Sequence, residues 1–286
     1  MSGNFMKSGR VAGYLAGYLV LAALPLTTLL VGCAATQNTA QTSSGSPEAR
    51  GSGDDNLSAR LHTELGAGYY ARGQYAVALQ ELRKALEADG AYAPAFSILG
   101  LVHAELREDK QAETHFQRAV DLSPNYSEAH NNFGLFLCQR GRPAESLKHF
   151  ELALTNPLYA TPEKALANAG NCALEKGDLV QAELYFVRAL KRVSNQSTAL
   201  LGMAEVHYRQ GRWLAARTLL RQLSGQFGDL AELSPQALWL GVRAERQLGD
   251  REAEANYGAL LRRRYPESNQ AQWLISGQYD KSGSLL

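Results

Sequence analysis

The side chains best suited to chemistry in this chain are three cysteines and six histidines. Histidine can act as a general base or a metal ligand, but these residues are scattered along the chain: they are His62, His103, His115, His130, His149 and His207. The sequence contains no Walker loop, no GxGxxG after a strand, no GxSxG and no HExxH. Three scattered cysteines are too few for a zinc site or a disulfide scaffold. We therefore expect no enzymatic activity, no cofactor and no metal site.

Cys33 is the cysteine whose setting points most directly to a modification. Lys7 and Arg10 precede an uncharged apolar stretch from Val11 to Val31, which is typical of a secretion signal. The sequence Leu30-Val31-Gly32-Cys33 resembles the bacterial lipobox, in which a peptidase cleaves before the cysteine and the cysteine sulfur receives a diacylglyceryl group. An uncleaved membrane anchor is the alternative, because a stretch of this length could also cross a bilayer.

The lipobox resemblance predicts the location of the protein. We expect residues 1–32 to be a signal peptide and Cys33 to carry a covalent lipid. Alanine follows at position 34. By similarity to the sorting rule of enterobacterial lipoproteins, this predicts delivery by the lipoprotein sorting machinery to the outer membrane. The lipid would sit in the inner leaflet and the protein would face the periplasm. Residues 33–57, rich in small polar side chains, are expected to be a flexible linker.

The rest of the chain repeats with a period close to 34 residues. A large residue followed by a small one recurs at Leu65-Gly66, Leu99-Gly100, Phe133-Gly134, Ala169-Gly170 and Met203-Ala204. The accompanying small and large positions resemble the tetratricopeptide consensus. In such repeats, two antiparallel helices approach closely at the small residues, and neighbouring repeats cover each other's apolar faces. The alternative is an ordinary helical bundle with a chance period.

We therefore predict an all-α tetratricopeptide superhelical solenoid of about six helix–turn–helix repeats, with about 12 to 13 helices, over residues 58–275. The expected repeats are approximately 59–92, 93–126, 127–162, 163–196, 197–233 and 234–267. Residues 276–286 carry no repeat pattern and are expected to be a disordered tail.

Cys138 and Cys172 occupy nearly equal heights on the first helices of the third and fourth predicted repeats. Side chains that lean toward each other from such neighbouring helices could meet. Because the periplasm is oxidising, we predict a disulfide between them. Two buried thiols that act as small apolar side chains are the alternative.

The first helices of such repeats line the face that binds partners. The predicted groove residues are Tyr70, Leu101, Asn131, Asn132, Leu135, Gln139, Lys164, Asn168 and Asn171. Asn132, Lys164 and Asn168 coincide with three positions of the carboxylate clamp of chaperone-binding tetratricopeptide domains. The alternative is a polar groove that binds extended peptide through its amides.

The charge balance argues against a nucleic-acid partner. The chain has 29 basic and 28 acidic residues and a formal net charge of +1. A dedicated nucleic-acid binder usually carries a clear excess of basic residues.

Several segments resemble the PilF/PilW family of type IV pilus biogenesis lipoproteins. They are Ala129–Cys138, Gln139–Arg142, Asn156–Tyr159, Asn168–Ala173 and Gly177-Asp178. The resemblance implies an outer-membrane pilotin that helps the pilus secretin reach the outer membrane and form multimers, and so supports pilus assembly and twitching motility. The alternatives are a scaffold for periplasmic enzymes of peptidoglycan synthesis or proteolysis, and an accessory subunit of a polysaccharide exporter.

Overall fold

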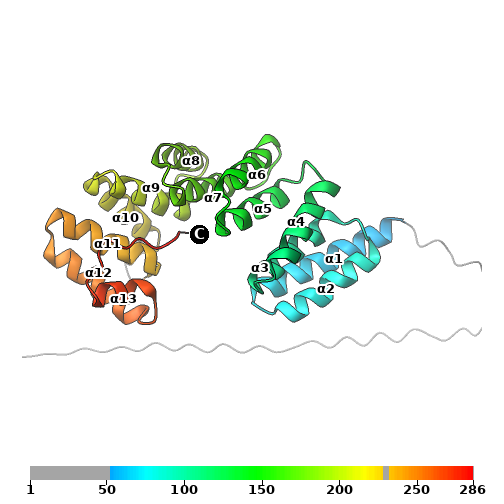
Figure 1. Cartoon of the computed structure of the whole chain (residues 1–286), viewed down its shortest axis with the longest axis horizontal. Coiled ribbons are helices and arrows are strands. Elements are labelled where there is room, and N and C mark those ends of the chain that lie inside the picture. Colours follow the sequence, from blue (N-terminus) through cyan, green and yellow to red (C-terminus); the bar gives the residue numbers. More distant parts are fainter. Residues whose placement is uncertain (1–51, 228–231, 286) are drawn as a thin grey trace, which may run out of the picture. The chain divides into compact units, whose positions relative to one another are not determined.

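Thirteen α-helices occur in residues 52–227 and 232–285, the part of the chain that the computed structural model describes. Twelve of them form six consecutive helix–turn–helix pairs, and a short helix follows (Figure 1). The helices are α1 (Ser52–Ala71), α2 (Tyr75–Ala88), α3 (Ala93–Glu105), α4 (Asp109–Leu122), α5 (Ser127–Gln139), α6 (Pro143–Thr155), α7 (Pro162–Glu175), α8 (Leu179–Arg192), α9 (Ser197–Arg209), α10 (Trp213–Phe227), α11 (Pro235–Leu248), α12 (Arg251–Arg264) and α13 (Asn269–Ile275). The predicted signal peptide and Cys33, the predicted lipidation site, lie outside the described residues.

In five of the six pairs, a glycine on the first helix packs against a large ring or aliphatic group on the second. A Cβ atom on Gly100 would lie 2.6 Å from the ring of Phe116, and one on Gly170 would lie 2.5 Å from the ring of Phe186. The same contact recurs at Gly66/Leu82, Gly134/Phe150 and Gly241/Tyr257. The spacing of 34 residues therefore reflects a repeated close approach of two helices.

The turns between the two helices of a pair use left-handed backbone. Glycines occupy this position in five pairs, with φ between 71° and 83°: Gly73, Gly141, Gly177, Gly211 and Gly249. Glycine is favoured there because it has no Cβ to clash. Arg107 takes the same place between α3 and α4 with φ of 62°, a conformation that costs an ordinary residue about 1–2 kcal/mol.

The first helices of successive pairs contact one another, from α1 with α3 through to α9 with α11. We call the surface of α1, α3, α5, α7, α9 and α11 that carries the predicted groove positions the inner face. Buried apolar side chains lie between the helices of each pair and between adjacent pairs. The prediction of an all-α tetratricopeptide array with six repeats is confirmed.

Two segments differ from the sequence-based expectation. Helix α1 begins at Ser52, inside the segment 33–57 that was expected to be a linker. Residues 276–285, expected to be a disordered tail, make specific contacts with α7, α9 and α11. The contacts are to residues far away in sequence, so composition alone did not reveal them. Within 52–227 and 232–285, every helix is too short or too polar to span a membrane.

Candidate functional site

A row of amide side chains crosses the inner face from α7 to α3. Asn168 Nδ2 donates to Asn131 Oδ1 at 3.1 Å, and Asn131 Nδ2 lies 3.4 Å from Asn132 Oδ1. Asn132 Nδ2 in turn donates to Ser97 Oγ at 3.2 Å. The structure therefore brings together three predicted groove asparagines, which we call the amide row. Each amide keeps further hydrogen-bonding capacity, so the row can contact a backbone laid across it.

The apolar groove residues flank this row. Leu135 packs against the cluster that contains the disulfide, and Leu101 packs against the cluster around Phe116. Gln139 and Lys164 are exposed. The groove therefore offers aliphatic surface beside its amides, as an extended peptide with alternating side chains requires.

Tyr70 lies apart from the amide row, near the end of α1. Its ring centroid is 6.1 Å from that of Tyr75 on α2. Burial raises the pKa of the Tyr70 hydroxyl, and the nearby charge of Glu105 raises it further. The phenol therefore stays neutral and can act as a hydrogen-bond donor on the inner face.

The predicted disulfide between Cys138 and Cys172 is confirmed. It joins α5 to α7 with their Cα atoms 5.8 Å apart. Both cysteines are buried, and Ser146 Oγ lies 3.3 Å from Cys172 Sγ. The bond fixes the two helices that carry Asn131 and Asn168, and so it holds the amide row in register.

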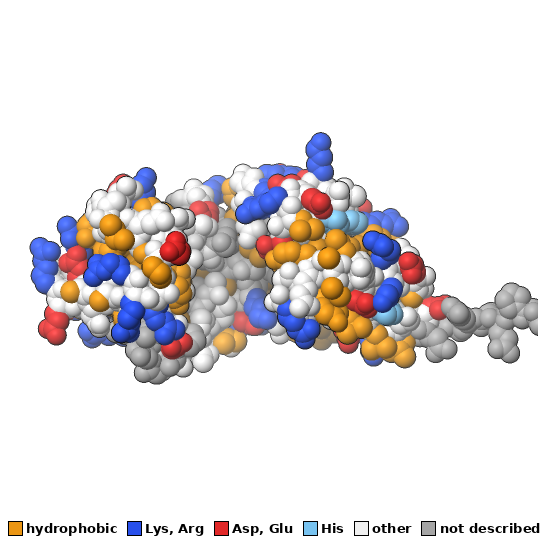
Figure 2. All heavy atoms as spheres, turned by 90° about the horizontal axis from the view of Figure 1, so that it is seen from below, with side chains coloured by type: hydrophobic (Ala, Val, Ile, Leu, Met, Phe, Trp, Pro, Cys, Tyr) orange, Lys and Arg blue, Asp and Glu red, His pale blue; other side chains and the backbone are white. Residues whose placement is uncertain are grey.

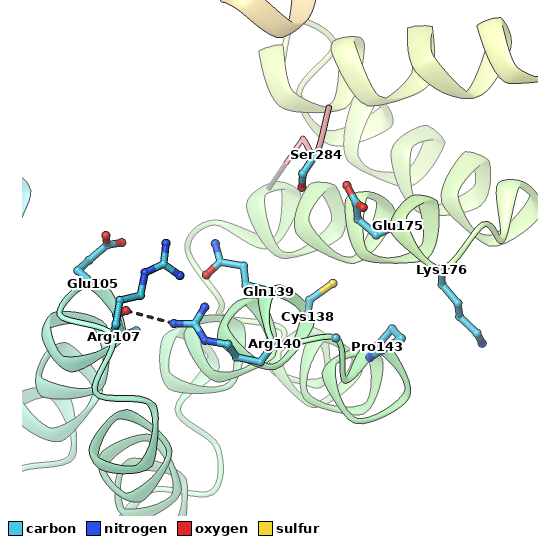
Figure 3. Close-up of a pocket in the computed structure, with 11 residues that line it drawn as sticks. Glu105, Arg107, Cys138, Gln139, Arg140, Pro143, Glu175, Lys176 and Ser284 are labelled. Atoms are coloured by element: carbon cyan, nitrogen blue, oxygen red, sulfur yellow. Dashed lines mark hydrogen bonds between the residues drawn. The ribbon is translucent and has the colours of Figure 1, made fainter. Parts of the chain in front are cut away.

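A cavity of about 610 Å³ opens beside the disulfide, at the C-terminal ends of α3, α5 and α7 (Figure 3). Its charged lining residues are Glu105, Arg107, Arg140, Glu175 and Lys176. Arg140 is held in place because it donates to Ala104 O at 3.2 Å and to Asp109 at 2.7 Å. The mixture of signs suits a zwitterionic or polar backbone segment better than a strongly charged ligand.

A buried ionic cluster supports the inner face between α9 and α11. Glu205, which is 2% exposed, pairs with Arg243 at 2.6 Å and with Arg209 at 2.8 Å. The Arg243 guanidinium lies 4.5 Å from the centroid of the Tyr208 ring. Because a buried ion pair contributes little net stability, its value here is to fix the orientation of side chains on this face.

Two histidines, His130 on α5 and His149 on α6, contact each other between these helices. His130 Nδ1 lies 3.0 Å from His149 Nδ1, and His130 Nε2 lies 2.9 Å from Pro124 O. Burial and the neighbouring His130 lower the pKa of His149 to about 4. Among the described residues, no group of three or more His, Cys, Asp or Glu side chains is arranged to hold a metal ion.

Comparison with known proteins places this geometry in a family. Tetratricopeptide repeat models match residues 63–127, 115–148 and 173–234. The type IV pilus assembly protein PilF of Pseudomonas aeruginosa is 31% identical over 245 residues, which cover 85% of this chain and 92% of that protein. The chain belongs to the PilF/PilW family.

Solved structures of PilF/PilW proteins agree with this assignment. The structure of PilW, described as a widely conserved type IV pilus biogenesis factor, superposes with a TM-score of 0.68 at 28% identity, covering 76% of this chain and 98% of PilW. The Pseudomonas aeruginosa PilF structure gives a TM-score of 0.68 at 28% identity, covering 80% of this chain and all of PilF. The family resemblance inferred from the sequence is therefore confirmed.

Sequence reasoning about this PilF/PilW-family chain missed the part of the inner face that belongs to α9 and α11. Glu205, Arg243 and Trp239 are buried there, although charged residues in a repeat are usually solvated. Trp239 could have indicated this region, because it is a tryptophan at an inner-face position in the repeat that matches the tetratricopeptide consensus least well.

Proposed function

We propose that this chain is an outer-membrane lipoprotein pilotin of type IV pilus assembly. In this proposal a lipid on Cys33 carries the protein through the lipoprotein sorting machinery to the inner leaflet of the outer membrane. The body binds the pilus secretin through the inner face, so that the secretin reaches the same membrane and forms multimers. The multimers then support pilus assembly and twitching motility.

One observation carries the groove assignment. Asn171, on the inner face of α7, donates from Nδ2 to the backbone carbonyl of Leu285 at 3.3 Å. An inner-face asparagine of this chain therefore holds a backbone carbonyl of a non-helical segment, and the amide row on α5 and α7 presents the same group beside Leu101 and Leu135. Amides that contact carbonyls supply affinity, while aliphatic neighbours supply side-chain selectivity.

The surface charge is compatible with a protein partner. Figure 2 shows Lys and Arg side chains interspersed with Asp and Glu and with apolar patches on the face that it presents. A mixed surface of this kind favours partners recognised by local shape and hydrogen bonding over a uniformly charged polymer.

The decisive experiment is a deletion strain blotted for heat-resistant secretin multimers in separated inner and outer membranes. Wild type should restore outer-membrane multimers, whereas Cys33→Ala should leave them reduced or in the wrong membrane. The groove variant Asn132→Ala/Leu135→Ala/Asn168→Ala should fail in the same assay while reaching the outer membrane normally.

Leu184→Ala is the matched control for the groove variant, because Leu184 is 51% exposed on α8, away from the first helices. It should restore multimers fully. Normal multimers in the groove variant would refute binding through the inner face, and normal outer-membrane multimers in the deletion strain would refute the pilotin function itself.

A further inference from the structure

The last described residues of the chain lie against the inner face of α7, α9 and α11 (Figure 1, red). After α13 ends at Ile275, the chain runs back past α11 toward α7. Lys281 contacts α11, Ser282 contacts α9 and Leu285 contacts α7. We call residues 279–285 the tail. It begins in a turn, closed by the Lys281 N–H donating to Gln278 O at 3.2 Å, and from Lys281 onward it crosses three successive repeats without helical structure.

Two donors of the inner face hold the backbone of the tail. Trp239 Nε1 donates to Lys281 O at 2.9 Å, and Asn171 Nδ2 donates to Leu285 O at 3.3 Å. Asn171 is 1% exposed, so its orientation is set by packing. Because every peptide has carbonyl groups, these two donors would hold any extended segment of suitable length.

The side chain of Tyr279, at the start of the tail, is held by contacts to its aromatic ring. The Tyr279 ring stacks on Trp239 with centroids 5.7 Å apart and planes 18° apart. The Arg246 guanidinium lies over the same ring, 4.0 Å from its centroid. Stacking and a cation over the ring face both require an aromatic residue.

A leucine position at the other end is recognised by apolar packing. Leu285 is half-buried, packs against the core cluster of α7 and α8, and lines a cavity of about 360 Å³. The aliphatic lining of that cavity comes from Leu201, Leu223 and Leu233. Between the two anchors, a Cβ atom on Gly283 would lie 2.8 Å from Gln270 Nε2, the tip of a flexible side chain that can shift, so this position is only weakly restricted.

The groups that contact the tail are held in place by the rest of the protein. Arg209, which lies 3.5 Å from Ser282 Oγ, is oriented by Glu205. Arg243 lies 5.9 Å from the centroid of the Trp239 ring and is itself paired with Glu205. Fixed donors and rings lower the entropy lost when a peptide binds.

We infer that the inner face of α7, α9 and α11 is a binding site for a polypeptide segment in which an aromatic residue is followed six residues later by leucine, and that the tail occupies this site as a tethered competitor. A partner segment with that spacing must displace the tail. Because the tail is joined to the same chain, its effective concentration is on the order of millimolar. The inference concerns repeats four to six and does not depend on the identity of the pilus partner.

The test measures whether release of the tail opens the site. A fluorescein-labelled peptide with the sequence of residues 276–285 is titrated with the full-length chain in detergent, followed by fluorescence anisotropy. The variant Tyr279→Ala/Leu285→Ala lacks both anchors of the tail, and we call it the released variant. It should bind the peptide at least about tenfold more tightly than wild type. Lys281→Ala is the matched control, because only the carbonyl of Lys281 contacts the site. It should behave as wild type.

A site variant separates peptide binding from nonspecific association. Adding Asn171→Ala to the released variant should reduce its affinity for the peptide about tenfold, without loss of helical circular dichroism. Independently, the indole N–H resonance of Trp239 should move in the released variant, because it loses its acceptor on Lys281, while the resonance of Trp213 stays in place.

Three results would overturn the inference. Equal peptide affinity for wild type and the released variant would mean that the tail does not compete. An unchanged Trp239 resonance would mean that the tail is not held there in solution. A dimer of wild type that becomes monomeric on release would place the tail in a second copy of the chain.

Discussion

Gly202→Ala should destabilise the protein because the added methyl group would overlap with a buried aromatic ring. A Cβ atom at this position on α9 would lie 2.2 Å from Phe186 Cζ and 2.5 Å from Cε1. Phe186 is fully buried, and the same ring also packs against Gly170 on α7, where a Cβ would lie 2.5 Å away. The ring therefore has little room to move, because it is packed closely against both α7 and α9.

The magnitude follows from two opposing effects. Overpacking of a filled core costs about 1–3 kcal/mol, and three ring atoms closer than 3.0 Å place this site at the upper end. Alanine regains about 1 kcal/mol of helix propensity. We therefore expect a net loss of about 2 kcal/mol in the free energy of unfolding, measured by urea titration followed by circular dichroism.

Two further variants decide whether the ring is the cause. Gly68→Ala on α1 adds the same methyl group with nothing within 4 Å, so it should stabilise by about 0.5–1 kcal/mol. In the Phe186→Leu background, Gly202→Ala should cost less than half of what it costs in wild type, because the distal ring atoms are gone. Equal effects of Gly202→Ala in both backgrounds, or a stabilisation like that of Gly68→Ala, would refute this account of the repeat.

Three other predictions concern the turn, the disulfide and pH. Arg107→Gly should raise the free energy of unfolding by about 0.5–1 kcal/mol, because it relieves left-handed backbone at a position that is glycine in the other pairs. The urea midpoint should rise accordingly, and a lower midpoint would contradict this. Cys138→Ser/Cys172→Ser should lower stability by about 3–4 kcal/mol through loss of a cross-link that spans 34 residues, and dithiothreitol should have no further effect on this variant. Because folding lowers the pKa of His149 to about 4, the imidazole of the unfolded chain is protonated first as the pH falls. The free energy of unfolding is therefore highest, as far as His149 is concerned, above about pH 6.5 and decreases toward pH 4. His149→Phe should therefore flatten the fall in urea midpoint between pH 7 and pH 4.5, and an equal fall in both proteins would exclude His149 as a source.

The helix pairs were predictable because their packing repeats in the sequence. Gly100 and Phe116 meet in one pair as Gly170 and Phe186 do in another, and both members of each contact lie within one period. The disulfide was predictable for the same reason, because Cys138 and Cys172 are 34 residues apart on neighbouring first helices. Short-range regularity of this kind is what a sequence displays directly.

The site on α9 and α11 was not predictable because its contacts join distant residues without a repeating pattern. Trp239 and Lys281 are 42 positions apart, and Asn171 and Leu285 are 114 positions apart. The tail contains one aromatic residue among small and charged ones, a composition typical of disorder. Its order depends on the surface it meets, which emerges only from the folded array.

The disulfide also determines where the array comes apart. Repeat arrays are held by nearest-neighbour interfaces, so they fray from their ends inward. A covalent link between α5 and α7 prevents the third and fourth repeats from separating even while the outer repeats open. Amide hydrogens should therefore exchange most slowly in α5 to α8, and reduction should remove this difference. The third and fourth repeats therefore stay together as a cross-linked centre, and the repeats on either side of it can unfold and refold independently of each other.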